Sequence, residues 1–550
     1  MPRHVACRAR LVTATLAVGP DAAHDRPVHA QRKAIAMKRQ YALRVLALLT
    51  LGLAGCAEDF DATPATEALV RETSAWPHYG GAGGRHFVEL DVLTKASVAG
   101  LDVAWIHRTG DTSRVFQGTP LLAAGQLVLC TPHNQIVALD PLTGGERWRF
   151  DPAVARHERY ANEGNCRGVA AWRDARAPQA ACGERILMAT NDARLFALDA
   201  RSGERCADFG VNGEVDLALG VGRIAWDGEY QVTSPPAVVG DLAVVGSSVS
   251  DNGRTDAPSG VVRAFDVRTG ALRWANDLAP PGYDHATMPA SDAGWALGTP
   301  NVWAPMVADA DRDLVFLPTG NPAPDYYRDG PADMDFFGSS VLALRASTGE
   351  LVWQFRTVHD DFWDFDVPSQ PVLADLDLGE GPVPALIQAT KMGFVFVLHR
   401  ETGEPLVPVE YREVPRHGPL ADRLSPVQPV PPDAFRVSRG YEPGGSVLGL
   451  CDGLEAESVI GDVFTPITEQ WTVGLPSNMG ATNWGGLAVD AARGLLAVPT
   501  SSVPFRTKLI PREAAEEFVS VVLDENASEA AKDAARAGFA AAFEIPDDAE

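Results

Sequence analysis

The stretch VALDPLTGGERWRF, residues 137–150, decides the fold because it recurs along the chain. Each copy has an apolar run, an Asp or a substitute for it, a turn that contains glycine, and a second run of strand character. The other copies are FALDARSGERCADF (196–209), RAFDVRTGALRWAN (263–276), LALRASTGELVWQF (342–355) and a weaker one, FVLHRETGEPLVPV (396–409). Two strands joined by a tight turn make a β-hairpin, so we expect one hairpin at each copy.

Two residue types occupy fixed places in these hairpins. A glycine stands in every turn, where the backbone needs a positive φ that glycine adopts without steric cost. The glycines are Gly144, Gly203, Gly270, Gly349 and Gly403. Four residues after the glycine, three copies have a tryptophan: Trp148, Trp274 and Trp353. A large flat side chain at one position per copy predicts docking between neighbouring units.

The spacing of the copies predicts the architecture. Asp140 and Asp199 are 59 residues apart, and Asp199 and Asp266 are 67 residues apart. Further strand pairs fill these intervals, and no long helical periodicity precedes residue 513. Intervals that are long and uneven suit four-stranded propeller blades with insertions better than an even solenoid. We therefore predict an all-β propeller.

Composition excludes some classes of function. Of 550 residues, 46% are hydrophobic and 22% are charged, which is typical of a globular protein. The formal net charge is −25. Because a nucleic-acid-binding surface is basic, this charge argues against nucleic acid as a partner.

The segment that begins at Met37, MKRQYALRVLALLTLGLAGCAEDF, is typical of a secretory signal. Its apolar run is shorter than the ~20 residues that a transmembrane helix needs. Its Leu-Ala-Gly-Cys end resembles a bacterial lipobox, which implies cleavage before Cys56 and lipidation of the Cys56 thiol; a buried apolar helix is the alternative. We expect 1–36 to be an upstream extension from a misassigned start, 37–56 the signal peptide and lipobox, and 57–75 a linker.

Five cysteines remain when Cys7 and Cys56 are set aside, which is an odd number for an oxidising compartment. They are Cys130, Cys166, Cys182, Cys206 and Cys451. At least one of them is therefore a free or buried thiol. We expect Cys166 to pair with Cys182, and the other pairings stay open. The spacings fit neither a zinc site nor a Cys-x-x-Cys-His haem motif.

A series of motifs runs from about Trp76 to Arg512. They are WPHYGG, CTPHNQIVALD, CRGVAAW, VTSPPAVVG, SGVVRAFDVRTG, PNVWAP, LPTGNPAPD, TVHDDFWDFDVPSQP, ATKMGFVFVL, NWGGLAVD and KLIPR. In this order they resemble the propellers of dehydrogenases that use pyrroloquinoline quinone (PQQ), most of all the membrane-associated glucose dehydrogenase branch. The resemblance implies an eight-bladed quinoprotein-type β-propeller over 76–512. The copies and NWGGLAVD account for roughly six such blades, so we interpret the C-terminal blades as missing from this chain.

The resemblance implies a PQQ site on the propeller axis beside a Ca²⁺ or Mg²⁺ ion. Asp251 and Asn252 in SVSDNG, and Asn321 in TGNPAPD, stand at the family's metal-ligand positions. We expect Asp364 in FWDFD to be a further ligand. Carboxylate and amide oxygens are the ligands that such hard cations prefer. Asx-Gly and Asn-Pro are also turn signals, so a turn role is the alternative for each residue alone.

Other positions match the family's contacts to the quinone, whose three carboxylates need cationic and hydroxyl donors. Arg167 in CRGVAAW matches the carboxylate-binding arginine, and Trp303 in PNVWAP matches the floor under the ring. Lys391 in ATKMG matches the lysine that donates to the quinone oxygens. The remaining cofactor positions are Gln117, Thr233, Ser248 and Asn483. The alternatives are inter-blade docking for Trp303 and a solvated strand edge for Lys391.

The stretch TVHDDFWDFDVPSQP (357–371) interleaves one histidine and four aspartates with aromatic residues. Neither face of such a strand would be apolar, which favours the rim of a pocket over a core strand. By resemblance, Asp364 is the catalytic aspartate that removes the proton of the substrate hydroxyl as hydride passes to PQQ. Lys391 would stabilise the charge on the reduced oxygens. We expect the remaining polar residues to support the site from behind or to be solvated; they are His359, Asp360, Asp361 and Asp366.

The chain departs from the family pattern in several places. Ala171 and Trp172 follow CRGV where some glucose dehydrogenases have a histidine, which leaves the sugar specificity open. The stretch 431–470 keeps only fragments of the pattern, and we expect a lipid anchor in place of the multi-helix membrane domain of the membrane-bound glucose enzymes. After KLIPR comes an acidic, alanine-rich segment, 513–550, which we interpret as a truncated insertion.

Together these patterns predict a lipid-anchored quinoprotein dehydrogenase on the periplasmic side of a bacterial membrane. It would oxidise a hydroxyl of a sugar or polyol, with glucose to gluconolactone first and quinate-like cyclic polyols and glycerol next. Electrons would pass to ubiquinone or to a separate cytochrome, since the chain has no haem motif. The alternative is a non-catalytic lipoprotein scaffold of the outer-membrane assembly type. A plain alcohol dehydrogenase is disfavoured because the chain has no pair of adjacent cysteines.

Overall fold

The computed structural model describes most of the chain between Trp76 and Pro511, and this part belongs to one compact unit. The described residues are 12–13, 76, 78–90, 93–113, 115–155, 160–328, 334–379, 381–438, 440–442, 458–511, 513, 518, 520–521 and 527–542. Apart from 12–13, the expected upstream extension, signal peptide, lipobox with Cys56 and linker lie outside these residues, as does Cys451.

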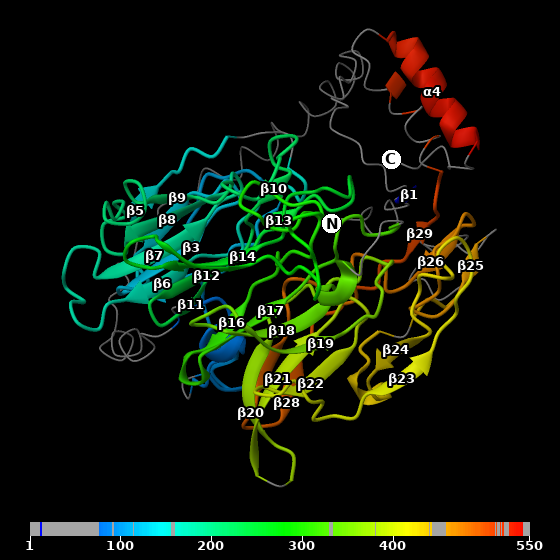
Figure 1. The fold of residues 1–550 in the computed structure, drawn as a ribbon. Helices are drawn as coiled ribbons and strands as arrows, with labels where there is room; N and C mark the ends of the chain where they lie inside the picture. The colour runs from blue at the N-terminus through cyan, green and yellow to red at the C-terminus, as the bar shows by residue number, and fades with distance from the viewer. Residues whose placement is uncertain are drawn as a thin grey trace, which may run out of the picture. The chain divides into compact units, whose positions relative to one another are not determined.

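Four four-stranded antiparallel sheets follow one another along the chain (Figure 1). They are formed by β2 (Leu121–Ala123), β3 (Gln126–Cys130), β4 (Ile136–Leu139) and β5 (Glu146–Phe150); by β6 (Ala170–Arg173), β7 (Glu184–Ala189), β8 (Arg194–Asp199) and β9 (Glu214–Asp216); by β11 (Ala237–Val239), β12 (Leu242–Val245), β14 (Val262–Asp266) and β15 (Leu272–Asn276); and by β16 (Val307–Asp309), β17 (Leu314–Pro318), β18 (Ser340–Arg345) and β19 (Leu351–Arg356). Within each sheet the strands pair in chain order, which is the arrangement of a propeller blade.

Smaller sheets complete the described strands. They are the three-stranded β20 (Val372–Asp377), β21 (Pro382–Ala389) and β22 (Val395–His399); the pairs β10 (Tyr230–Gln231) with β13 (Ser248–Val249), β23 (Glu410–Glu413) with β24 (Val427–Val430), and β27 (Ala488–Asp490) with β28 (Leu495–Ala497); and a mixed sheet of β1 (Val12–Thr13), β29 (Phe505–Thr507), β26 (Thr472–Gly474) and β25 (Val459–Ile460). The helical elements are α4 (Glu529–Ala542) and the 3₁₀ turns η1 (Ala82–Gly84), η2 (Val98–Gly100), η3 (Ala310–Arg312), η4 (Met334–Phe337) and η5 (Asp433–Phe435). Among the described residues, the one long helix therefore follows residue 513, as predicted.

The predicted hairpins form, and their turns repeat one hydrogen-bond pattern. The glycine NH donates to the carbonyl oxygen four residues earlier, from Gly144 to Asp140 and from Gly270 to Asp266 at 2.8 Å each. The Asp140 carboxylate also accepts from the backbone NH groups two and three residues later. All five turn glycines have φ between 69° and 77°. This confirms the sequence prediction, since glycine adopts this conformation without strain.

The tryptophans dock neighbouring sheets onto each other, as predicted. Trp274 of β15 lies against the turn of Gly349 in the next sheet, and its Nε1 donates to the Ala346 carbonyl at 2.8 Å. Trp353 of β19 repeats this at the turn of Gly403, where it donates to a carbonyl oxygen at 3.0 Å. A Cβ on either glycine would come within 2.6 Å of the indole, so these turns also need glycine for space.

The second copy holds its neighbour differently. Ala207 stands where three other copies have tryptophan, and Gly270 of the next turn packs against the backbone of Gly210. The Gly210 NH donates to the Thr269 carbonyl at 2.9 Å. A disulfide from Cys206 to Cys182, which lies between β6 and β7, fastens this copy within its own sheet.

The expected pairing of Cys166 with Cys182 is wrong. Cys166 pairs with Cys130, with Cα atoms 6.1 Å apart, and Cys182 pairs with Cys206, with Cα atoms 5.8 Å apart. Cys166 precedes β6 and Cys182 follows it, so a strand about 13 Å long holds them at opposite ends. Since disulfide-bonded Cα atoms lie about 4.4–6.8 Å apart, this separation excludes the expected pair.

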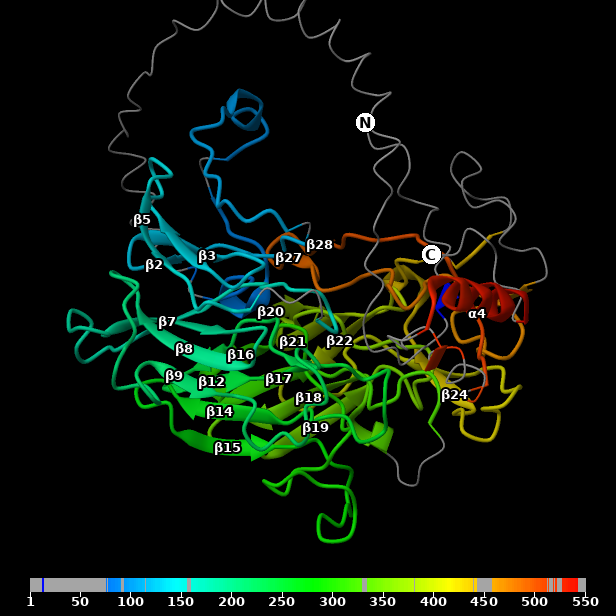
Figure 2. The same cartoon turned by 90° about the horizontal axis from the view of Figure 1, so that it is seen from above.

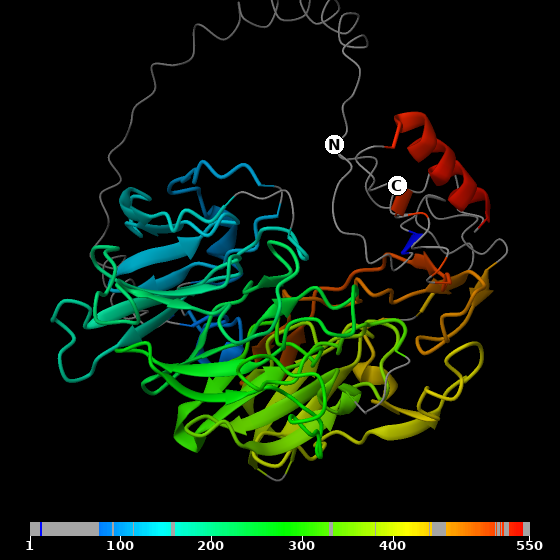
Figure 3. The ribbon, with the colours of Figure 1, turned by 45° about the horizontal axis from the view of Figure 1, so that its top comes forward.

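The hydrophobic core lies between neighbouring sheets. One cluster joins Val128 of the first sheet to Phe196 of the second, and another joins Val244 of the third to Leu342 of the fourth. The first strands β2, β6, β11 and β16 lie next to one another in this order, which makes them the inner ends of successive blades. Figures 2 and 3 show these sheets side by side. A sheet between two neighbours is buried on both faces, and all five residues of β17 are buried.

These features confirm the predicted all-β propeller fold. Repeated four-stranded blades, docked through a fixed tryptophan and glycine, are its distinguishing features. The blade number of eight stays a prediction. In the described part of the chain, none of the helices combines the length and the apolar character that crossing a membrane requires.

Candidate active site

Residues 357–366, which the sequence predicts to rim a pocket, form an irregular loop after β19. Trp363 and Phe365 are buried in the hydrophobic cluster beneath the loop and anchor it. Asp361 is fully buried, and its carboxylate accepts from the backbone NH groups of Trp363 and Phe365 at 2.9 Å each. Between them Asp364 has a left-handed backbone, φ 59°, which is uncommon outside glycine and frequent at functional sites.

Asp364 and Lys391 form an enclosed ion pair. Lys391 follows β21 by two residues and donates from Nζ to Asp364 Oδ1 at 2.7 Å and to the Asp364 carbonyl at 2.8 Å. A third bond joins Nζ to Asp366 Oδ2 at 3.0 Å. The two predicted catalytic residues therefore meet, and the lysine binds one carboxylate oxygen and the backbone carbonyl of the aspartate.

Two further carboxylates approach this pair. Burial, and then repulsion from neighbouring carboxylates that include Asp364 and Asp366, raises the pKa values of Asp251 and Asp325. Asp325 and Asp366 are buried, and Asp251 and Asp364 are half-buried. Lys391 bonds to two of these four carboxylates, Asp364 and Asp366, so ionisation of all four would leave an excess of negative charge that a divalent cation would neutralise.

The pKa values reflect this excess. Burial, and then repulsion from Asp366 and Asp364, raises the pKa of Asp251 to about 8. Burial also raises the pKa of Asp364 to about 7, although Lys391 acts in the opposite direction. Burial lowers the pKa of Lys391, but attraction by Asp364 and Asp366 outweighs burial and the net pKa is raised. Without a cation, the cluster therefore retains protons near neutral pH.

Trp303 and Arg167 adjoin the cluster. Trp303 Nε1 donates to Asp366 Oδ2 at 3.1 Å. The Arg167 guanidinium lies 5.0 Å from the Trp303 ring centre and donates to Thr233 Oγ1 at 2.5 Å. Burial lowers the pKa of Arg167 to about 10, so it remains charged at neutral pH. The structure thus brings Arg167, Thr233, Trp303, Asp364 and Lys391 of the predicted site together.

The residues present fit a hard cation. Asn252 Oδ1 and Asp325 Oδ1 are buried and have no hydrogen-bond partner within the described chain. Buried acceptors rarely stay unpaired, so an ion or water is expected at each. Asp251 precedes Asn252 in the chain and acts electrostatically on Asp325, so these three residues are candidate oxygen ligands of the kind that Ca²⁺ and Mg²⁺ prefer. Ligation by Asp364 stays a prediction.

The residues also fit a planar anionic cofactor. Arg167 Nε is buried without a hydrogen-bond partner in the part of the chain described, and so is Gln117 Oε1, which as an acceptor does not itself bind a carboxylate. A charged arginine with an unused NH is a donor for a carboxylate. Trp303 and Trp484 both face the guanidinium, with ring centres 5.0 Å and 5.9 Å from it. Their indole faces offer surfaces on which an extended ring system can stack.

Three predicted contacts are engaged with protein groups. Ser248 Oγ accepts from Asn162 Nδ2 at 2.6 Å, and Asn483 Nδ2 donates to the Met479 carbonyl at 2.8 Å. Asn321 Oδ1 accepts from Ser339 Oγ at 2.6 Å, and Asn321 Nδ2 is buried without a partner in the described chain, so an amide turned over would present its oxygen there instead. Cofactor or metal contacts of Ser248, Asn483 and Asn321 stay predictions.

The sequence left Asp366 among the supporting or solvated residues, and the solvated alternative is wrong. Asp366 is buried, accepts from Lys391 and Trp303, and accepts from the Asn321 NH at 2.7 Å. Asp361 is likewise buried and holds the loop. His359 is half-buried, and burial, and then Arg356, lowers its pKa to about 4.

Sequence reasoning missed three residues of the site. Asp325 adds a carboxylate, and Tyr326 and Asn478 hold the Asp364 carboxylate through Oδ2. Asp325 ends the motif LPTGNPAPD and Tyr326 follows it. Their closeness in sequence to Asn321 is therefore a signal from which a role in the site can be predicted. For Asn478, in SNMG, the sequence offered no comparable signal.

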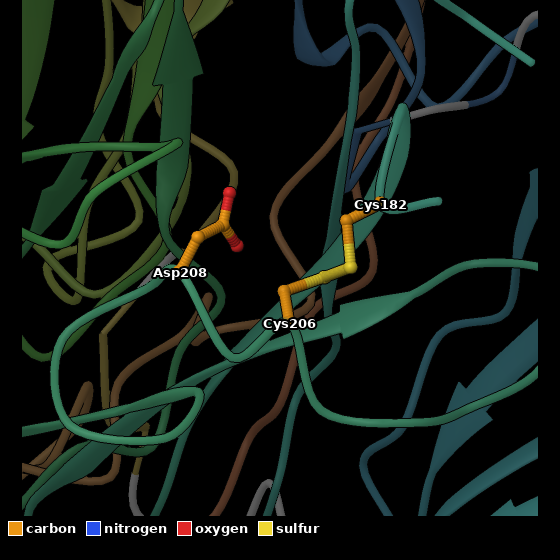
Figure 4. A group of neighbouring side chains, drawn as sticks. All are labelled: Cys182, Cys206 and Asp208. Atoms are coloured by element: carbon orange, nitrogen blue, oxygen red, sulfur yellow. A yellow bond between two sulfur atoms is a disulfide. The ribbon is translucent and has the colours of Figure 1, made fainter. Parts of the chain in front are cut away.

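Cys182, Cys206 and Asp208 lie close enough together to resemble a metal site, but they are not one (Figure 4). The two sulfurs are joined in a disulfide and cannot serve as thiolate ligands. Asp208 instead forms an ion pair with Arg185 at 2.6 Å.

Comparison with protein families fits this geometry. The family model for the β-propeller domain of PQQ-dependent glucose, ethanol and alcohol dehydrogenases matches residues 76–545. The chain belongs to the PQQ-dependent dehydrogenase family. The match to this quinoprotein family model includes all the described blades and also the alanine-rich segment with α4. It confirms the family resemblance that the motifs indicate.

Individual quinoproteins are also similar to this chain. It is 36% identical to the quinoprotein glucose dehydrogenase of Escherichia coli strain K12, over 82% of this chain and 59% of the relative. It is 34% identical to the glycerol dehydrogenase large subunit of Gluconobacter oxydans strain 621H, over 82% and 63%. The chain thus spans about three fifths of the length of these relatives.

A solved quinoprotein supports the fold. The quinohemoprotein alcohol dehydrogenase ADHIIG of Pseudomonas putida HK5 matches with a TM-score of 0.58 and 23% identity, over 81% of this chain and 59% of that one. At this identity the similarity concerns the fold alone, and it agrees with the propeller derived from the repeats.

Proposed function

We propose that this quinoprotein is a PQQ-dependent dehydrogenase that oxidises a hydroxyl group of a sugar or polyol. The observation that carries the proposal is the enclosed pair of Asp364 and Lys391, linked through Asp366 to Trp303 and Arg167. A base, a fixed positive charge, a stacking surface and a carboxylate-binding arginine are the protein groups that PQQ-dependent alcohol oxidation uses.

When bound, PQQ would supply the oxidising power, and a Ca²⁺ or Mg²⁺ ion would supply Lewis acidity. Arg167 would bind a carboxylate of the cofactor, and Trp303 would fix the plane of its ring. Asp251, Asn252 and Asp325 would hold the cation through oxygen atoms. These roles assign the unpaired buried atoms Arg167 Nε, Asn252 Oδ1 and Asp325 Oδ1 to ligands.

Asp364 would act as the general base that accepts the proton of the substrate hydroxyl. It must be ionised to do so, and Lys391 at 2.7 Å favours the ionised carboxylate against the effect of burial. Lys391 also places a fixed positive charge where negative charge develops during the reaction. The left-handed backbone of Asp364 and the bond from Lys391 to its carbonyl hold the base in place.

Sugars and polyols lead among the substrates because similar proteins carry the names glucose dehydrogenase and glycerol dehydrogenase. Glucose to gluconolactone is first, with glycerol and quinate-like cyclic polyols next. Ala171 and Trp172 stand where some glucose enzymes have a histidine, and Trp172 packs against Arg268 at 4.5 Å and donates to Asp241 at 3.3 Å. Sugar specificity would therefore come from other residues.

We also propose a periplasm-facing location, with Cys56 as a lipid anchor and ubiquinone or a separate cytochrome as electron acceptor. The signal pattern before Cys56 supports export. The two disulfides support an oxidising compartment, because such bonds are rare where thiols are kept reduced.

Reconstitution tests the proposed activity. The purified chain, loaded with PQQ and Ca²⁺ or Mg²⁺, should reduce a dye with glucose, glycerol or quinate as the electron donor. Asp364→Asn keeps the size of the side chain and removes the base, so it should bind PQQ and lose about 10²–10⁴-fold in kcat. A folded wild-type chain that does not bind PQQ would refute the enzyme and favour the scaffold alternative.

The contacts give the scaffold alternative little support. A scaffold needs the docking turns, but it has no use for a lysine enclosed by Asp364 and Asp366 with two more carboxylates nearby. Enclosed charges cost free energy unless they are compensated, so such a cluster is explained better by a ligand than by structure alone.

A further inference from the structure

The Asp364 carboxylate has a second anchor that the proposed chemistry does not use. Tyr326 Oη donates to Asp364 Oδ2 at 3.1 Å. Asn478 Nδ2 donates to Tyr326 Oη at 2.8 Å and to Asp364 Oδ2 at 3.3 Å. The three side chains close a triangle of hydrogen bonds on Oδ2, whereas Lys391 binds Oδ1.

The triangle joins distant parts of the chain. Tyr326 lies between β17 and β18, directly after Asp325, and is only 4% exposed. Asn478 follows β26, more than 150 residues later, and is half-buried. Asp364 lies between them in sequence, on the loop that Asp361 fastens. Tertiary structure alone therefore brings the three groups together.

The second anchor matters because Lys391 alone would leave the carboxylate free to turn. A carboxylate has about four acceptor sites, two on each oxygen. Tyr326 and Asn478 occupy both sites of Oδ2, and Lys391 occupies one site of Oδ1. One acceptor site on Oδ1 remains for a proton.

We propose that Tyr326 and Asn478 are positioning residues of this dehydrogenase. They hold Oδ2 of Asp364, so that Oδ1 is the atom that receives the proton of the substrate hydroxyl. The inference rests on the proposed function, since it presumes that Asp364 is the base. Small displacements of a base are costly, because proton transfer requires a distance of about 2.6–3.2 Å between heavy atoms.

The surroundings of Tyr326 show which substitution is informative. Tyr326 and Asn478 line a hollow together with Trp363, Phe365 and Thr472. An alanine at 326 would enlarge this hollow and disturb the packing, whereas phenylalanine removes only the hydroxyl. Tyr327 is the matched control, because it is the next residue, has the same side chain and is 44% exposed.

Steady-state kinetics of the full chain, loaded with PQQ and Ca²⁺, test the proposal. Tyr326→Phe should lower kcat about tenfold to a hundredfold, with KM and the affinity for PQQ within about twofold of wild type. The kinetic isotope effect with substrate deuterated at the reacting carbon should rise, because the chemical step becomes slower. Tyr327→Phe should match wild type. If Tyr326→Phe fails to fold, Asn478→Ser, which breaks the same triangle, is judged by the same criteria.

Crystal structures of wild type and Tyr326→Phe provide a readout that does not need turnover. The Asp364 carboxylate should lose its fixed position in the variant. If wild type is active and Tyr326→Phe equals Tyr327→Phe in kcat, the inference is overturned and the proposed function stands. A rise in KM alone would make Tyr326 a substrate contact and would also overturn it. If wild type oxidises no alcohol, the proposed function fails. If Asp364 also keeps its position in the crystal structure of Tyr326→Phe, the inference that Tyr326 positions Asp364 fails as well.

Discussion

At the scale of single residues, Lys391 supplies the positive charge that balances the neighbouring carboxylates of the site. Its ammonium group binds Asp364 Oδ1, the Asp364 carbonyl and Asp366 Oδ2 within 3.0 Å, so all three of its NH donors are used. Asp366 in turn accepts from Trp303, which couples the ion pair to the stacking surface. The base, the charge and the ring floor are thus one connected network, and a change at one member reaches the others.

Removal of this lysine should be costly for stability. Lys391→Met keeps the length of the side chain and leaves two neighbouring carboxylates without their cation. We expect the free energy of unfolding to fall by roughly 3–5 kcal/mol, as for other broken buried pairs. Chemical denaturation at about pH 8 measures it, with the exposed Lys95→Met as the control. Equal losses in the two variants would show that the network is not a stabilising unit.

The metal-free protein should lose stability as pH rises. Burial raises the pKa of Asp251 to about 8 and of Asp364 to about 7, from an ordinary value of 3.8. Between about pH 4 and about pH 8, these carboxyl groups stay protonated in the folded chain and lose their protons in the unfolded chain. The free energy of unfolding therefore falls as the pH rises through this range.

A divalent cation should reverse this loss, because it replaces the bound protons. Melting temperatures at about pH 5 and about pH 8.5, each with EDTA and with excess Ca²⁺, measure the effect. The stabilisation by Ca²⁺ should be larger at the higher pH and smaller in Asp251→Asn. A stabilisation that does not depend on pH would mean that the cation binds elsewhere.

At the scale of elements, the same contact joins the third sheet to the fourth and the fourth sheet to the hairpin that follows it. The indole of one hairpin covers the turn glycine of its neighbour and donates to a carbonyl of that turn, as Trp274 does at Gly349 and Ala346. The contact requires glycine for two reasons: the backbone has a φ of 77°, and the indole fills the space that a Cβ would occupy. Sequence periodicity can therefore reveal a contact between separate sheets.

Trp274→Ala should destabilise the protein more than Trp148→Ala. Trp274 is 8% exposed and has a hydrogen-bond partner, whereas Trp148 is half-buried and its Nε1 has no partner within the described residues. We expect a loss of about 3–5 kcal/mol for Trp274→Ala. The loss for Trp148→Ala should be smaller by about 1 kcal/mol or more, since no hydrogen bond is lost. Urea denaturation of the two variants provides the test, and a larger loss at Trp148 would contradict it.

At the scale of the whole molecule, the disulfides differ in what they connect. Cys182–Cys206 lies within the second sheet, whereas Cys130–Cys166 joins the first sheet to the segment that carries Arg167. The closed loops are 36 and 24 residues long, so each bond should stabilise the fold by about 3–4 kcal/mol.

Removal of the two disulfides should have similar effects on stability but different effects on cofactor binding. Serine at both 130 and 166, or at both 182 and 206, should lower the free energy of unfolding by similar amounts. The first pair of substitutions should in addition weaken PQQ binding, because Cys166 immediately precedes Arg167. Denaturation and PQQ titration of both variants measure the two effects. Equal PQQ affinities would show that the disulfide does not position the arginine.

The candidate site was predictable where a residue belongs to a recognisable motif. Asp364, Lys391, Trp303, Arg167 and Thr233 were named from motifs, and they meet in space. Asp366 and Asp325 are harder to predict, because an acidic residue in a loop is solvated more often than buried. Tyr326 and Asn478 could not be chosen, since their meeting depends on loops that only the fold brings together.

The sequence by itself determined the hairpins, their turn glycines, the docking tryptophans and the all-β propeller. These features repeat at fixed spacing and depend on local backbone geometry, which neighbouring residues specify. Tertiary structure alone decided that Cys166 joins Cys130, that Asp366 is buried and that Tyr326 and Asn478 hold Asp364. Such contacts depend on which strands and loops become neighbours at the blade interfaces and at the inner ends of the blades. The spacing of residues along the chain does not show which of them lie close together in space.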